Sequence, residues 1–352
     1  MIKRSPWWDK AVHADRRPLL MARGRMREAA RSYFAAEGFT EVECAALQVS
    51  PGNEAHLHAF ATQRIATDGT RRPLYLHTSP EFASKKLLAA GERKIFALAP
   101  VYRNRERGDL NAPEFTMLEW YRVEERYDSV IEDTLNIVKA AAEAVGATAF
   151  EFRGKRADPF AAPLRITVAE AFHELAGIDL AATLGGDGAT DRDALARQAS
   201  GAGLKVTADD TWSDIFSRIL VERIEPRLGL DAPTILDEYP RAEAALARAA
   251  PRDERFAERF ELYLCGVELA NGFGELTDPA EQRRRFEHEM DEKQRIYGER
   301  YPVDEDFLKA LAHMPPASGV ALGFDRLVML ATHAGRIDRV MWTPIQEYDD
   351  DE

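Results

Sequence analysis

The sequence lacks the features of a secreted or membrane-spanning protein. It contains only 2 cysteines, Cys44 and Cys265, too few for a disulfide framework, and no C-x-x-C pair suggests zinc. No run approaches the ~18 apolar residues that span a bilayer. The first 17 residues have no continuous apolar core of the secretory kind. We therefore expect a cytoplasmic protein with no membrane partner.

Positive charge is also scarce. The chain of 352 residues has 47 Lys and Arg against 60 Asp and Glu, a net charge of -13 and a pI near 5.3. Such a surface repels a nucleic-acid backbone, which argues against a broad nucleic-acid footprint but leaves room for a local basic patch. The hydrophobic fraction of 45% and charged fraction of 30% are typical of a globular protein with one large domain or two ordinary ones.

The stretch 96–122 organises the chain. It predicts a buried strand over 95–102, an arginine-rich loop over 103–113 and a returning antiparallel strand over 114–121. Because side chains alternate along a strand, one face carries Phe115, Met117, Glu119 and Tyr121. A carboxylate and a phenol between apolar neighbours fit either an edge strand with one wet face or a pocket wall that binds a cation.

A second block, residues 258–278, reads as strand, turn-like Asn271-Gly272 and strand. Glu261 and Glu268 are seven positions apart, so a bulge or a strand pair must intervene if they share a face. Asn271, Phe273 and Glu275 share a face if the backbone stays extended. Buried carboxylates are costly unless they are paired or bound to metal, so Glu261, Glu268 and Glu275 are either ordinary surface residues or ligands of a bound group.

A third block, residues 318–330, has small residues that suit a strand approached by a ligand, followed by a helix. We expect Asp325 to cap that helix and Arg326 to lie at its N-terminal end, where the helix dipole favours anions.

The remaining pattern is mostly helical. Helices are predicted over 18–38, 82–90 and 128–144, with strands over 39–43 and 74–77 and a mostly helical part over 154–251. Ser79 or Thr78 can cap the helix over 82–90. His56 and His58 are spaced as metal ligands, but a strand with one polar face accounts for them better because no third ligand is near.

The three blocks, in this order, resemble motifs of class II aminoacyl-tRNA synthetases. "PEFTMLEWY" at 113–121 is similar to motif 2 of lysyl-tRNA synthetases, and the chain most resembles their stand-alone paralogues that attach lysine to elongation factor P. The resemblance runs from about residue 18 to about 344 and is weakest over 154–251. It implies an α+β fold with an antiparallel sheet flanked by helices, ATP and Mg²⁺ as cofactors, and a homodimer built through motif 1. Cys44-Ala45 stands where motif 1 usually has proline.

The resemblance also implies a catalytic domain over 18–346 and a set of site residues. Residues 1–17 are polar and predict a loose lead-in, and the acidic residues at the end predict a tail over 347–352. Arg103 would bind the α-phosphate and Arg326 the γ-phosphate as the catalytic residues, and Glu261 and Glu268 would hold the metal. The ATP-binding set is Arg103, Asn104, Arg105, Glu106, Glu268, Leu269, Gly323 and Arg326. The substrate-binding set is Ser79, Pro80, Glu81, Glu119, Tyr121, Asn271, Phe273, Glu275 and Ala321.

Three positions in the arginine-rich loop depart from the family pattern. Arg105 stands where the family has the glutamate that reads adenine, with Glu106 one residue later. Asn111 and Ala112 stand where the family has histidine and asparagine. Either Glu106 takes the role through a shifted loop, or backbone groups read adenine.

Three functions remain open on the sequence. The first is ligation of β-lysine or lysine to elongation factor P, the second is charging of tRNA, and the third is an idle binding protein. About 17 residues precede the first predicted helix, whereas a lysyl-tRNA synthetase carries an OB-fold of about 100 residues there, so we expect no anticodon-dependent tRNA binding. Ala321 favours the ligase, since the synthetases usually have glycine and one methyl is worth ~1–3 kcal/mol of discrimination.

Overall fold

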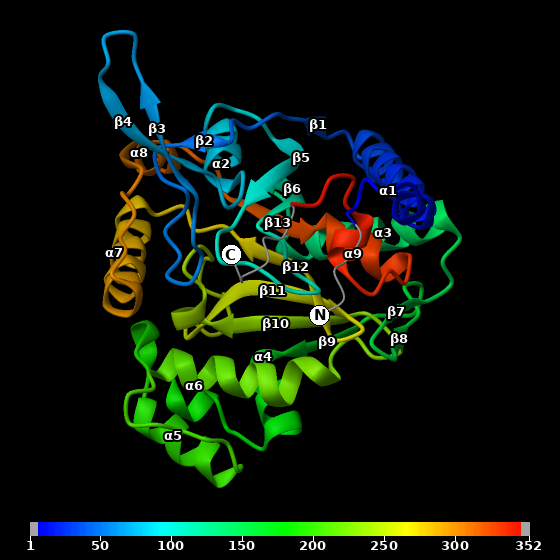
Figure 1. Ribbon diagram of the computed structural model, residues 1–352. Coiled ribbons are helices and arrows are strands. Elements are labelled where there is room, and N and C mark those ends of the chain that lie inside the picture. Colours follow the sequence, from blue (N-terminus) through cyan, green and yellow to red (C-terminus); the bar gives the residue numbers. More distant parts are fainter. Residues whose placement is uncertain (1–5, 346–352) are drawn as a thin grey trace.

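The structure of the protein is a computed structural model that describes residues 6–345. Its centre is an eight-stranded sheet with the order β1-β5-β6-β13-β12-β11-β10-β9 (Figure 1). Neighbouring strands pair antiparallel except at the two edges, where β1 with β5 and β9 with β10 are parallel. The predicted α+β class, with an antiparallel sheet flanked by helices, is confirmed apart from those two edge pairs.

The strands are β1 (Thr40–Glu41), β2 (Leu47–Gln48), β3 (Ala61–Ile65), β4 (Arg71–Leu76), β5 (Lys94–Tyr102), β6 (Glu114–Val123), β7 (Phe150–Phe152), β8 (Lys155–Ala157), β9 (Leu164–Thr167), β10 (Thr234–Pro240), β11 (Phe256–Leu264), β12 (Val267–Gly274) and β13 (Ala317–Gly323). The α-helices are α1 (Lys10–Ala36), α2 (Glu81–Ala89), α3 (Tyr127–Val145), α4 (Val168–Ala171), α5 (Arg192–Gly201), α6 (Trp212–Ile219), α7 (Pro279–Tyr297), α8 (Glu305–Leu311) and α9 (Phe324–Ala331). None of the helices within residues 6–345 combines the length and the apolar character that crossing a bilayer requires.

The two faces of the sheet have different neighbours because side chains alternate along each strand. Leu118, Trp120 and Val320 point to the face that packs against α1, α3 and α9 in the main hydrophobic core, and Figure 1 shows these helices together at one end of the sheet. The residues between them, such as Glu119 and Ala321, point to the opposite face. That face is therefore free to carry polar chemistry.

Helix α1 starts earlier than its sequence pattern predicts. It begins at Lys10, where Asp9 caps it by accepting hydrogen bonds from the next backbone N–H groups, and Pro18 lies inside the helix. The loose lead-in predicted for residues 1–17 is wrong where it overlaps the helix. Arg16 is buried and donates to backbone carbonyls of the segment after α9. This long-range contact stabilises the first turns and leaves no trace in the local sequence.

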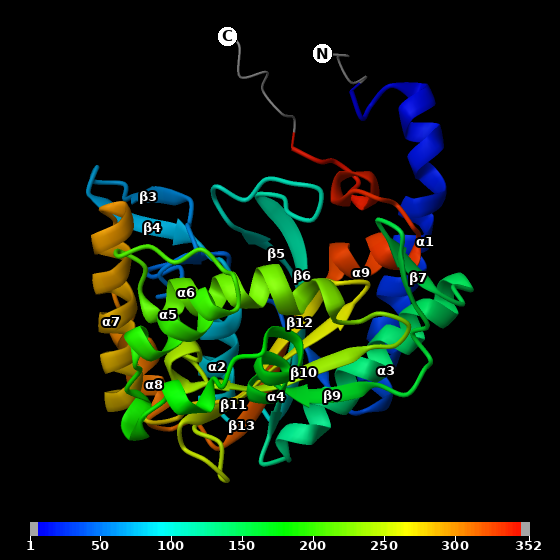
Figure 2. The same cartoon turned by 90° about the horizontal axis from the view of Figure 1, so that it is seen from below.

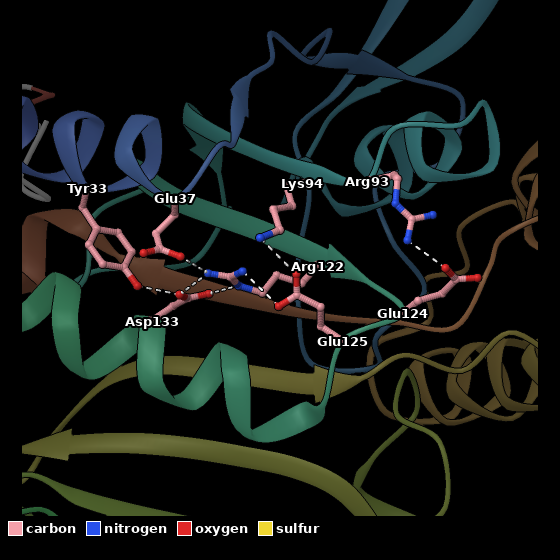
Figure 3. Close-up of polar contacts among 8 residues, drawn as sticks. All are labelled: Tyr33, Glu37, Arg93, Lys94, Arg122, Glu124, Glu125 and Asp133. Atoms are coloured by element: carbon pink, nitrogen blue, oxygen red, sulfur yellow. Dashed lines mark hydrogen bonds and ion pairs between the residues drawn. The ribbon is translucent and has the colours of Figure 1, made fainter.

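A buried ion cluster joins α1, α3 and β6 (Figure 3). Arg122 on β6 places Nε and Nη2 each 2.7 Å from a carboxylate oxygen of Asp133 on α3, a bidentate pair. Glu37 and Glu125 accept further bonds from this guanidinium at 3.2 and 3.0 Å. Tyr33 on α1 donates to Asp133 at 2.6 Å. These contacts hold β6 in place from the face of the sheet that packs against α1 and α3.

The part between residues 154 and 251 is not purely helical. Its helices α4, α5 and α6 lie along one side of the sheet (Figure 2) and enclose a hydrophobic core of their own with neighbouring strands. Strands β9 and β10 of the same segment extend the main sheet. This segment therefore contributes side chains to the central sheet as well as a helical layer.

Candidate active site

Adjacent strands bring the predicted substrate residues into two rows on the open face of the sheet. Asn271 on β12 is in register with Ala321 on β13, which is in register with Glu119 on β6. The next row joins Phe273, Gly319 and Tyr121 in the same way. The shared face predicted for Asn271 and Phe273 follows from this regular pairing.

The predicted metal pair lies on the same face because of an irregularity in the sheet. Glu261 on β11 is in register with Asn271, but the register shifts between Leu262 and Tyr263, so that Tyr263 opposes Glu268 on β12. The shift leaves buried Leu269 outside the ladder pairs and turns Glu268 to the face of Glu261. The predicted need for a bulge or a strand pair is confirmed, since both occur.

Three side chains hold Glu261 in place. Tyr239 and Tyr263 donate their hydroxyl hydrogens to Oε2 at 2.5 and 2.6 Å, and Arg259 Nη2 lies 2.6 Å from Oε1. Burial raises the pKa of both phenols well above the usual range, so they remain donors. Burial, and then the charge of Glu261, raises the pKa of Glu268. The two carboxylates are therefore close enough for the charge of one to oppose ionisation of the other, an effect that a shared cation would reverse.

Arg326 reaches the same place from the start of α9. Its Nη1 lies 2.9 Å from the Glu268 carbonyl and 3.6 Å from the Glu268 carboxylate. Its Nε donates to the carbonyl of Leu110 at 3.2 Å, and Nη2 donates to Asn111 Oδ1 at 3.1 Å. These contacts fix the guanidinium between the acidic pair and the arginine-rich loop.

Asp325 does not cap α9, so that prediction is wrong. Gly323 occupies the N-cap position without a side-chain bond. Asp325 is buried at the second helical position, where it accepts from the Thr116 N–H at 2.6 Å and pairs with Arg23. A tertiary partner on α1 and one on β6 outcompete the local capping contact.

Arg103 also points toward the acidic pair. Its Nε donates to the Thr78 carbonyl at 3.3 Å, and its guanidinium lies 5.3 Å from the centre of the Phe115 ring. Its charge lowers the pKa of Glu268, against the larger effect of burial. Arg103, Glu268 and Arg326 thus converge on one side of the molecule.

The rest of the arginine-rich loop divides between two directions. Asn104 and Arg105 turn toward the outside, where Arg105 adopts φ 64° and pairs with Glu299. Glu106 accepts from the Asn111 amide, which in turn contacts Arg326. Glu106 therefore lies on the Arg326 side of the loop, and Arg105 lies on its outer side.

The other end of the site is built on α2 and β6. Ser79 Oγ donates to Glu119 Oε2 at 2.5 Å and accepts from the Glu81 N–H at 3.1 Å, while Pro80 is the N-cap residue of α2. Tyr121 donates to Glu119 Oε1 at 2.7 Å. Ser79 is therefore not the N-cap residue that the sequence predicts, but its Oγ accepts from the first N–H of the helix and contacts Glu119 in the pocket.

Three carboxylates meet at this end. Glu119 and Glu275 are each almost fully buried, and Glu81 shares the buried ammonium of Lys85 with Glu275. Burial raises the pKa of Glu119 to about 8, and burial raises that of Glu275 to about 7 against the lowering effect of Lys85. A pocket of this kind is suited to bind positively charged groups.

Several residues of the site escaped the sequence analysis. Lys85 stands four residues after Glu81, a helical ion-pair spacing that could have identified it. Tyr239 lies in the segment of weakest resemblance and carried no local signal. Glu54 lines a recess beside Ser79 and Glu81, and burial raises its pKa to about 7.

The donor set fits magnesium brought by a nucleotide. Within the described part of the chain, no three or more His, Cys, Asp or Glu side chains group so as to hold a metal. His56 and His58 instead contact Tyr297 at 2.9 Å and Glu299 at 3.1 Å. Mg²⁺ typically takes one or two carboxylates together with waters and phosphates, and Glu261 and Glu268 match that requirement.

Comparison with known proteins agrees with this geometry. The family described as "tRNA synthetases class II (D, K and N)" matches residues 4–347. An elongation factor P–(R)-β-lysine ligase of Haemophilus influenzae (strain PittGG) is 35% identical over 92% of this chain and 93% of its own length. The ligase of the same name from Erwinia tasmaniensis is 36% identical over the same shares. A lysine–tRNA ligase of Pelotomaculum thermopropionicum is 33% identical over 98% of this chain and 66% of its own length. The chain belongs to the class II tRNA synthetase family of the D, K and N type.

Proposed function

We propose that this protein activates (R)-β-lysine or lysine with ATP as an aminoacyl-adenylate and transfers the aminoacyl group to a lysine side chain of elongation factor P. The observation that carries the proposal is the arrangement on one sheet face. Two buried carboxylates, Glu119 and Glu275, and the partly buried Glu81 suit ammonium groups. They lie beside two arginines and two glutamates that suit a triphosphate with its metal.

The chemistry follows from these charges. A carboxylate oxygen of the amino acid attacks the α-phosphorus of ATP, and pyrophosphate leaves. Negative charge spreads over the phosphoryl oxygens in the transition state, where Arg103 at the α-phosphate and Arg326 at the γ-phosphate stabilise it. Glu261 and Glu268 would hold Mg²⁺, which neutralises phosphate charge when bound. The acceptor amine then attacks the aminoacyl carbonyl carbon, and AMP leaves.

The ammonium groups of the substrate define the other end of the proposal. Glu81 would bind one amino group, and Glu275 together with Tyr121 would bind the other. Asn271 and Phe273 line the space between them, and Ala321 adds a methyl group next to Glu119. That methyl supports a substrate whose amino group is displaced by one carbon.

The acceptor is the point at which two functions of this family diverge. The relatives named as elongation factor P ligases match over nearly their whole length, which supports the protein acceptor. The lysine–tRNA ligase relative matches almost all of this chain, which keeps tRNA as the second candidate. A translation factor as acceptor implies the cytoplasm, and the resemblance of α1 and β1 to motif 1 supports a homodimer.

The test is a transfer assay with both acceptors. The protein is incubated with ATP, Mg²⁺ and each lysine isomer, together with either elongation factor P or tRNA, and the labelled product is identified. We expect a modified elongation factor P with its mass increased by one lysyl residue. Labelled tRNA with unmodified factor would refute the ligase, and no adenylate with any isomer would favour the idle binding protein.

A further inference from the structure

One positive side chain lies inside the acidic end of the site, and neither the predicted ATP-binding set nor the predicted substrate set contains it. Lys85 on α2 has a side chain that is 1% exposed, with Nζ 2.6 Å from Glu275 Oε2 and in contact with Glu81 Oε1. It therefore bridges a carboxylate on its own helix and one at the end of β12. The two carboxylates are the ones that would receive the two ammonium groups of the substrate.

The charged side chains around Lys85 give the pocket a definite net charge. Glu81 on α2, Glu119 on β6 and Glu275 after β12 supply three negative charges when ionised, and Lys85 supplies one positive charge. The pocket therefore carries a net charge of about −2 in its ionised form, which equals in magnitude the charge of two ammonium groups. Without Lys85 the third carboxylate would remain unmatched and would take up a proton, because an unpaired buried charge is costly.

The other groups near this cluster do not change the balance. Tyr121 donates to Glu119 and stays neutral, since burial raises its pKa well above the usual range. Arg248 lowers the pKa of Glu275, but its own guanidinium pairs with Glu258 at 2.5 Å. Glu54 faces Glu81 from the recess, where burial favours its neutral form.

We propose that Lys85 is a positioning residue that sets the net charge of the pocket and the separation of Glu81 and Glu275, and thereby selects a diamino acid. This inference rests on the proposed function. Lys85 touches neither the phosphates nor the reacting carboxylate in this scheme, and acts through the two glutamates. Its helix places the ammonium between them before any substrate arrives.

The charge is tested by Lys85→Met, which keeps the length of the side chain. Loss of an opposite charge at this distance raises a carboxyl pKa by about 1–3 units. The half-maximal point in the pH dependence of kcat/KM for lysine or β-lysine should therefore move up by about 1–3 pH units, with KM raised about tenfold or more at pH 7. The assay is pyrophosphate exchange with the full chain, followed from pH 6 to about pH 10.5, so that a midpoint raised by about 1–3 units from about 7 lies within the range.

The matched control is the next residue. Lys86 also pairs with two acids, Asp304 at 2.8 Å and Asp306 at 3.0 Å, but away from the pocket. Lys86→Met should keep the wild-type midpoint and KM. A Lys85→Met enzyme that loses activity equally at every pH has lost only a structural contact, and this result overturns the proposal.

The separation is tested by Lys85→Arg, which keeps the charge but has a broader head group. We expect its pH midpoint to stay and the ratio of kcat/KM between lysine and β-lysine to change by at least about fivefold, since one carbon of displacement is worth ~1–3 kcal/mol. If Lys85→Met does not fold, an unchanged ratio in Lys85→Arg overturns the proposal. If the wild-type enzyme shows no pyrophosphate exchange with any diamino acid, the proposed function itself is refuted. This result is distinct from the two variant results that overturn the role of Lys85.

Discussion

Gly319 offers a sharp test of the pocket geometry. It lies on β13 between Tyr121 and Phe273, and a Cβ atom there would stand 2.3 Å from Tyr121 Cε1 and 2.6 Å from Glu275 Oε1. Both neighbours are buried and cannot retreat. Gly319→Ala should therefore displace the groups that bind one ammonium. Losing one charge-assisted hydrogen bond costs about 1.5–3 kcal/mol, which corresponds to a KM for the diamino acid raised about 10–150-fold.

The assay is amino-acid-dependent pyrophosphate exchange, with KM measured separately for the diamino acid and for ATP. The KM for ATP should stay close to the wild-type value, because the phosphate-binding residues lie in other rows of the sheet. Gly24→Ala is the control: its Cβ meets nothing within 4 Å in α1, so we expect unchanged kinetics and a gain of ~1 kcal/mol in stability. A Gly319→Ala enzyme whose KM for the diamino acid stays within about twofold of wild type, below the smallest change worked out above, would refute the assigned pocket.

Three further predictions concern charge. Arg326→Ala should lower kcat for pyrophosphate exchange by about 10²–10³-fold with an unchanged circular dichroism spectrum; surviving exchange would show that the γ-phosphate contact is misassigned. The affinity for a diamino acid, measured by calorimetry, should rise as pH increases from 6 to 8.5, because burial raises the pKa of Glu275 to about 7 and this carboxyl must lose its proton to bind an ammonium group. Burial also raises the pKa of Glu119, to about 8. Because the folded state then binds more protons at these two carboxyls than the unfolded state, their contribution to the free energy of unfolding falls as pH rises from the unfolded to the folded pKa values. Asp133→Ala should lower the free energy of unfolding in urea by about 3–5 kcal/mol, because it removes the buried bidentate partner of the Arg122 guanidinium and leaves only the more exposed Glu37 and Glu125. Glu124→Ala removes an exposed ion pair with side chains 61% and 57% exposed and should change the free energy of unfolding by less than about 1 kcal/mol. Equal effects would contradict the cluster drawn in Figure 3.

The alternation of side chains made much of the site predictable from the sequence. The facing of Glu119 and Tyr121 into one pocket required only the period of a strand, and the seven-residue spacing of Glu261 and Glu268 required an irregularity that the structure contains. The resemblance to known motifs then supplied roles that no spacing rule could give. Those individual roles stay predictions until the assays above are done.

The errors share one physical origin. Asp325 was judged by a local capping rule and the start of α1 by the spacing of its apolar residues, while both also have partners far along the chain. Tyr239 supports Glu261 from a segment that resembles the family least, so its position followed from the fold alone. Long-range contacts of this kind are invisible to spacing and periodicity.

The register shift between β11 and β12 has a consequence for how new specificities arise. Along β12, Glu268 lies on one side of it, and Asn271 and Phe273 lie on the other, so one irregular step separates the proposed metal ligand of this strand from the side chains proposed to line the amino-acid pocket. Substitutions at Asn271 or Phe273 would change which amine the pocket binds without moving Glu268. Deleting one residue at the register shift would turn the side chains of one part of β12 to the opposite face of the sheet. This point of the chain therefore tolerates substitutions but not insertions or deletions.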